Sequence, residues 1–102
     1  MSIRDQVFLF TSNVSSIIGR AHLDLVGLIS PATVTVAPHG CDTKGGTYAA
    51  MYGTDGTALS FDLTADCPHS VSLEDFQAAR FIKLLGTVDD GVEIRPVFRD
   101  LM

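Results

Sequence analysis

The sequence predicts an all-β fold, an antiparallel β-sandwich of about seven to eight short strands. Three observations predict this fold class. Hydrophobic residues alternate with polar ones at a period of two, turn residues separate the alternating runs, and a helical periodicity occurs only once. We expect a single β domain over 1–102, because domains cluster at about 100–150 residues.

The expected strands share short apolar or alternating stretches bounded by Gly, Pro, Asp or Asn. In chain order they are 7–10, 21–28, 33–36, 47–52, 58–63, 81–85 and 92–98. Asp55-Gly56 is a strong hairpin signal because both residue types tolerate a positive φ, and Asp89-Asp90-Gly91 is a second turn of this kind. In the last strand, Val92 and Ile94 share one side with Pro96 and Phe98.

One short segment has helical signals. Ser72 stands at an N-cap position with Asp75 three residues later, and Leu73, Phe76 and Ala79 share a face. A helix of this length is marginal without tertiary support. We therefore expect one short helical turn near 73–79 that leads into the strand at 81.

Composition and charge exclude several classes of protein. Hydrophobic residues make up 46% of the chain and charged residues 19%, which is unlike a disordered chain. The net charge is −5, and the seven Lys and Arg residues are scattered, so we expect no nucleic-acid partner. We also expect no membrane partner, since no apolar run approaches the roughly 18 residues of a spanning helix.

Two Cys-His pairs are the only candidate metal ligands. His39 and Cys41, like Cys67 and His69, are spaced i, i+2, which places both side chains of a pair on one face of an extended chain. The two pairs could build a Cys2His2 zinc site, or the cysteines could form a Cys41–Cys67 disulfide. A reducing cytoplasm favours the third interpretation, two free thiols and two solvated imidazoles. We expect no cofactor.

No catalytic constellation stands out from the sequence. A nucleophile needs an oriented base beside it, and Ser70 next to His69 lacks the Gly-x-Ser-x-Gly surroundings of a nucleophile elbow. The aspartates concentrate at turns, where their side chains bond the local backbone. We therefore expect a binding or assembly protein and not an enzyme.

The N-terminal segment offers a candidate interface. Val7, Phe8, Leu9 and Phe10 are four consecutive apolar residues, so the strand is either buried on both faces or meets a partner. A terminal strand is a common site of contact between subunits, because an edge presents unpaired backbone groups. We expect residues 1–12 to form a partner-contacting arm or strand, with core burial as the alternative.

A series of short motifs also follows a fixed order along the chain. The motifs are 25–28, Pro31-Ala32, 33–36, Gly46-Thr47-Tyr48, Asp55-Gly56-Thr57, 59–63, 73–76, 80–84, Gly86-Thr87 and Arg99. Together they resemble the small β-sandwich module of tailed-phage virion structural proteins, over about residues 20–102. The chain departs from the module at 38–46, where the family tends to show Ser-x-Asp-Gly, and at 95–97.

The resemblance implies a jelly-roll-like or discoidin-like sandwich and a non-enzymatic role in the virion. The expected function is a capsid decoration (cement) protein of a tailed bacteriophage, made in the host cytoplasm. Its expected partners are the major capsid or another virion protein and further copies of itself, as a trimer or dimer. The alternative is a carbohydrate- or receptor-binding module of a head or tail fibre, with Tyr48, Tyr52 and Phe76 as stacking residues.

Overall fold

The computed structural model describes residues 7–19, 25–71 and 79–98. Ten β-strands and no helix occur in these ranges. The strands are β1 (Phe8–Thr11), β2 (Val14–Ser15), β3 (Ile18–Gly19), β4 (Leu25–Ile29), β5 (Val34–Cys41), β6 (Ala49–Ala50), β7 (Phe61–Leu63), β8 (His69–Ser70), β9 (Phe81–Leu85) and β10 (Glu93–Phe98). The predicted all-β class is confirmed. The predicted helical turn near 73–79 falls almost entirely on residues outside those described.

The strand number exceeds the predicted seven to eight because four of the ten strands have only two residues. An alternation of period two cannot be read from two residues, so β2, β3 and β8 gave no signal in the sequence. No helix in the described ranges is long and apolar enough to cross a membrane.

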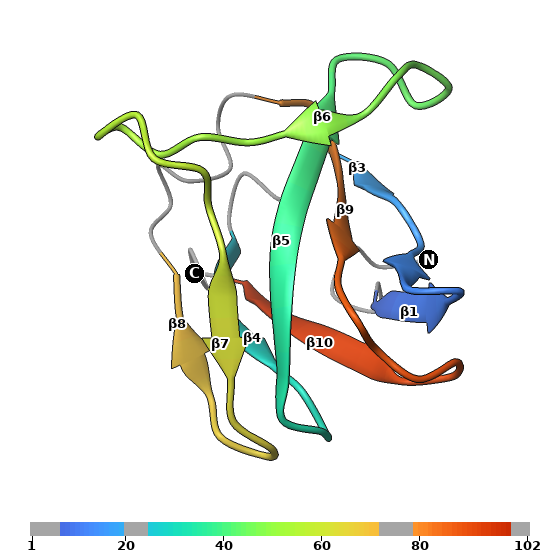
Figure 1. Ribbon diagram of the computed structural model, residues 1–102, viewed down its shortest axis with the longest axis vertical. Helices are drawn as coiled ribbons and strands as arrows, with labels where there is room; N and C mark the ends of the chain where they lie inside the picture. Colours follow the sequence, from blue (N-terminus) through green and yellow to red (C-terminus); the bar gives the residue numbers. More distant parts are fainter. Residues whose placement is uncertain (1–6, 20–24, 72–78, 99–102) are drawn as a thin grey trace.

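All pairings are antiparallel, and they join the strands into one curled sheet. Its order is β6-β5-β9-β2-β1-β10-β4-β8, with β7 paired to β5 and β3 to β9. Figure 1 shows β5 and β7 running upright, while β10 and β4 cross them at an angle. One wall thus holds β5, β7 and β9, the other holds β1, β10, β4 and β8, and β2 links the walls by pairing with both β9 and β1.

The hydrophobic core draws on strands of both walls. It contains Phe8 and Phe10 from β1, Leu25 and Leu28 from β4, Val36 from β5, Phe61 and Leu63 from β7, Ile82 and Leu84 from β9 and Ile94 from β10, together with Ile18, Met51 and Val88. Strands β1, β7 and β9 alternate buried and more exposed positions, as in Phe8–Thr11, whereas β4 buries Gly27 and Leu28 in succession. The period of two in the sequence therefore marks which side chains reach the core.

Strand β5 is longer than the sequence predicted, and it continues through Pro38 to Cys41. A proline lacks the N–H that a ladder needs. The carbonyl of Pro38 accepts from the Met51 N–H at 3.2 Å, so the Pro38 nitrogen points toward the same edge of the strand. That edge changes partner here, from β7 at Val34–Val36 to β6 at His39 and Gly40. The proline stands at the junction between the two partners.

Two turns contribute residues to the groove that is described in the next subsection. Asp66, with φ of 63°, lies in the turn between β7 and β8, and its N–H donates to the Ser30 carbonyl at 2.7 Å. At the other end, Gly91 has φ of 88°, and the Asp90 carboxylate accepts from the Ser12 N–H at 2.8 Å. The predicted Asp-Gly turn at 55–56 also occurs, with Gly56 at φ of 81° and the Gly53 N–H bonded to the Thr57 carbonyl at 2.9 Å.

Candidate interaction face

The four predicted interface residues divide between the core and the surface. Phe8 and Phe10 are completely buried, whereas Leu9 is 43% exposed and Val7 is half-buried. Strand β1 is not an edge strand, because it pairs with β10 at Phe8–Leu9 and with β2 at Phe10–Thr11. Contact with a partner through this segment is therefore restricted to the outward side chains of Val7 and Leu9. Residues 1–6 of the predicted arm lie outside the described ranges.

Leu9 belongs to an outward face built by β1, β10 and β4. Leu9 is the register partner of Glu93, and Arg95 is the register partner of Ile29. Register partners in an antiparallel pair project to the same side of the sheet. Glu93 and Arg95 are exposed and Ile29 is half-buried, so an acid and a base stand side by side on β10 with an apolar residue flanking each.

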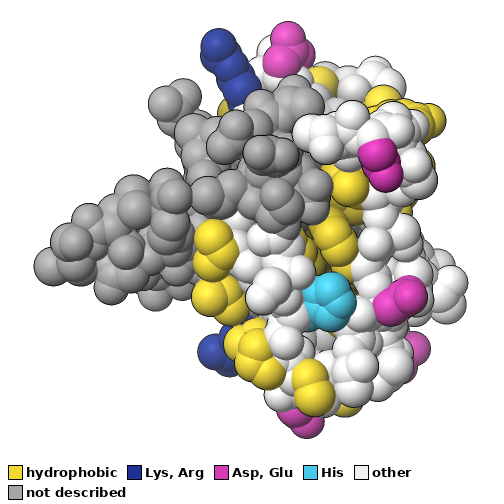
Figure 2. Space-filling model, turned by 90° about the vertical axis from the view of Figure 1, so that its left-hand side faces the viewer, with side chains coloured by type: hydrophobic (Ala, Val, Ile, Leu, Met, Phe, Trp, Pro, Cys, Tyr) yellow, Lys and Arg dark blue, Asp and Glu magenta, His cyan; other side chains and the backbone are white. Residues whose placement is uncertain are grey.

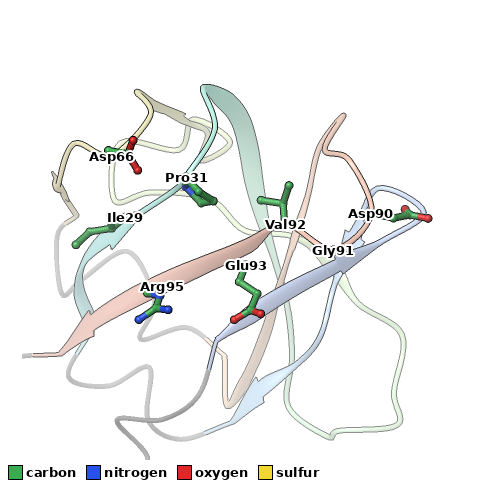
Figure 3. A pocket seen from close by; sticks show the side chains of 8 residues that line it. All are labelled: Ile29, Pro31, Asp66, Asp90, Gly91, Val92, Glu93 and Arg95. Carbon is green, nitrogen blue, oxygen red and sulfur yellow. The ribbon is translucent and has the colours of Figure 1, made fainter.

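A groove with a volume of about 530 Å³ opens on this face. It is lined by Ile29, Pro31, Asp66, Asp90, Gly91, Val92, Glu93 and Arg95. Figure 3 shows Asp66 and Asp90 at opposite ends of the lining, with Glu93 and Arg95 between them. Seven carboxylates and four Lys or Arg side chains fall in the described ranges, and this groove takes three of the former and one of the latter. Charged side chains of both signs thus meet at this groove.

The four candidate metal ligands are not brought together. His39 and Cys41 lie at the end of β5, a strand whose seven residue steps span about 23 Å at ~3.3 Å each. Cys67 follows Leu63, which pairs with Val34 at the opposite end of β5. Both cysteines are free, and a disulfide needs Cα atoms within about 7 Å. The Cys2His2 site and the Cys41–Cys67 disulfide are therefore wrong. The described residues contain no group of three or more potential ligands that could hold a metal ion.

His39 and Cys41 both lie in β5, beyond the end of the strand predicted at 33–36. His39 is the register partner of Lys83 on β9, and the Lys83 ammonium lies 4.7 Å from the centre of the Tyr48 ring. Desolvation by burial and then the Lys83 charge lower the pKa of His39. Burial and then Cys41 raise the pKa of Tyr48.

The surface offers two smaller features away from the interaction face. A groove of about 280 Å³ is lined by Gly40, Cys41, Asp42, Ala49, Ala50, Met51, Tyr52 and Ala79, and Tyr52 is 61% exposed. Figure 2 shows the side on which β7 and β8 lie, where hydrophobic side chains line a hollow beside a histidine. On β8, the Nδ1 atom of His69 is buried without a hydrogen-bond partner within the described part of the chain.

Comparison of the chain with protein-family models, curated protein sequences and solved structures gives no match. The geometry of the face is therefore the only evidence for an interaction at this surface. Sequence reasoning proposed Leu9 for an interface but did not propose Glu93 or Arg95. The signal was present, because placing Val92 and Ile94 on the inner side of the last strand leaves Glu93 and Arg95 on the outer side.

Proposed function

We propose that this chain is a virion structural protein of a tailed bacteriophage, a capsid decoration (cement) protein that binds the outer shell as a homo-oligomer. The motif order over residues 20–102 supports this proposal through its resemblance to the phage module. We also propose that the two walls of the curled sheet correspond to the two layers of the jelly-roll-like or discoidin-like sandwich that the resemblance implies.

The observation that carries the proposal is the face around Leu9, which offers the contact between copies that a homo-oligomer needs. An apolar side chain that is 43% exposed stands on a hydrogen-bonded strand, beside a groove and an exposed acid and base. Protein contacts combine a small apolar centre with charged residues around it. A protein that binds only the assembled shell stabilises that state by mass action, so the proposed role requires a contact surface and no chemistry.

The experiment is co-sedimentation of the purified protein with empty phage shells, together with mass spectrometry of intact virions. We expect the chain in virions and a stoichiometric band in the shell pellet. Shells without the protein should break at lower temperature. Leu9→Asp should break the contact between copies and with it most of the shell binding of the homo-oligomer, whereas Tyr52→Asp places the same charge on a more exposed apolar residue elsewhere and should retain both. Virions that contain none of this chain contradict the proposal.

The alternative role, a carbohydrate- or receptor-binding module of a head or tail fibre, has one supporting observation. Tyr52 is 61% exposed at the groove that also contains Asp42, and an exposed aromatic ring beside a carboxylate can stack on a sugar while the carboxylate accepts from its hydroxyls. The Tyr48 ring is covered on one side by Lys83, and Phe76 lies outside the described residues. A glycan array tests this role, with binding lost in Tyr52→Ala.

A further inference from the structure

The outward face has a layout that can be followed residue by residue. Along β10, Glu93 and Arg95 are neighbours on the outer side, about 6.6 Å apart at two residue steps. Toward β1, Leu9 lies beside Glu93. Continuing this antiparallel register by two residues places Val7 beside Arg95. Both Val7 and Leu9 are in the outward phase, because Phe8 between them is buried.

On the other side of β10, the face has a projection and a hollow. Ile29, at the end of β4, lies beside Arg95. Beyond Ile29 the chain leaves the sheet at Pro31, so the position beside Glu93 has no strand and instead contains the groove, whose lining includes Pro31, Val92 and Glu93. Figure 3 shows Ile29, Arg95 and Glu93 in succession across this face.

From this layout we propose that the face binds a second copy of the same chain, about a two-fold axis that lies across β10 between Glu93 and Arg95. This rotation places Glu93 of each copy over Arg95 of the other. It also places Leu9 over Val7 of the second copy and Ile29 over its groove. The positions named above thus meet one another reciprocally, which is the condition for an isologous interface.

Charge and area both favour a second copy as the occupant. The two reciprocal Glu93–Arg95 pairs neutralise an acid and a base that are both exposed in the single chain. Asp66 and Asp90, at opposite ends of the groove, stay at the solvated rim. A stable dimer buries about 800 Å² per partner, roughly a seventh of the 5910 Å² surface, which is about one face of a molecule measuring 34 × 30 × 27 Å.

The inference goes beyond shell binding and is tested on the isolated protein, so that either proposal can fail without the other. Sedimentation velocity over about 1–100 μM measures the association of wild type, Glu93→Arg and Arg95→Glu. We expect a wild-type dimer and at least a tenfold weaker association in each single variant, because like charges then face each other. An equimolar mixture of the two variants should associate about as tightly as wild type, and so should the double variant Glu93→Arg/Arg95→Glu.

Asp42→Arg and Lys44→Glu are the matched controls. Their side chains are also exposed and two residues apart, but they lie in the loop after β5, so both should dimerise like wild type. Far-UV circular dichroism checks that each variant is folded. A wild-type monomer at 100 μM, a trimer, or a dimer that tolerates both single reversals overturns the inference. Weakened single variants that fail to associate when mixed overturn the proposed pairing.

Discussion

Replacing one buried serine tests how the two walls of the sheet are joined. Ser15 lies on β2 and is only 6% exposed. Its Oγ accepts from the Leu84 N–H at 2.7 Å and donates to the Ser16 carbonyl at 2.8 Å. In Ser15→Ala the Leu84 amide stays in the core without its acceptor. A buried unsatisfied donor costs about 1–3 kcal/mol, so we expect a loss of about 2 kcal/mol in the free energy of unfolding and a Tm lower by roughly 10 °C.

The neighbouring serine is a matched control. Ser16 Oγ also makes two backbone hydrogen bonds, accepting from the Leu9 N–H at 3.1 Å and donating to the Val7 carbonyl at 3.0 Å, but Ser16 is exposed. Water can replace these bonds, so Ser16→Ala should cost below about 1 kcal/mol. Urea unfolding followed by far-UV circular dichroism gives both values. Equal losses in the two variants would refute the argument from burial.

Three further predictions concern the core, the thiols and a histidine. Phe8→Ala should lower the free energy of unfolding by about 3–5 kcal/mol and Leu9→Ala by less than about 1 kcal/mol, since their exposed fractions are 0% and 43%. Similar losses would contradict the placement of Phe8 in the core and Leu9 at the surface. Cys41 and Cys67 should both alkylate under non-reducing conditions, Cys67 faster because it is the more exposed; an unmodified mass would contradict this. NMR titration should give His39 a pKa below 6.5. As the pH falls, the unfolded chain then protonates His39 at a higher pH than the folded chain does. The contribution of His39 to stability is therefore complete above pH 6.5 and falls as the pH decreases; a measured pKa above 6.5 would reverse this pH dependence.

Local patterns predicted the strands well where they were long enough to alternate. The alternation in the last strand put Val92 and Ile94 on one side and left Glu93 and Arg95 on the other, and the structure buries Ile94. The extension of β5 through Pro38 could not be read from the sequence, because a proline is tolerated there only where one neighbouring strand gives way to another. That junction is formed by segments distant in the chain.

The candidate metal site shows the same limit. The i, i+2 spacing puts His39 and Cys41 on one face only because β5 continues through them. Spacing within a segment says nothing about the distance between segments, and the length of β5 separates these residues from Cys67. Two plausible half-sites therefore lie far apart.

By itself, the sequence determined the all-β class, the inward and outward sides of the longer strands, and the tight turns at Gly56 and Gly91. These properties depend on the two-residue repeat of an extended chain and on the allowed φ of single residues. The tertiary structure decided which strands pair, and so brought Leu9 from one end of the chain beside Glu93 from the other. Pairing is set by how all side chains fill one common core, and only that shared packing creates the interaction face.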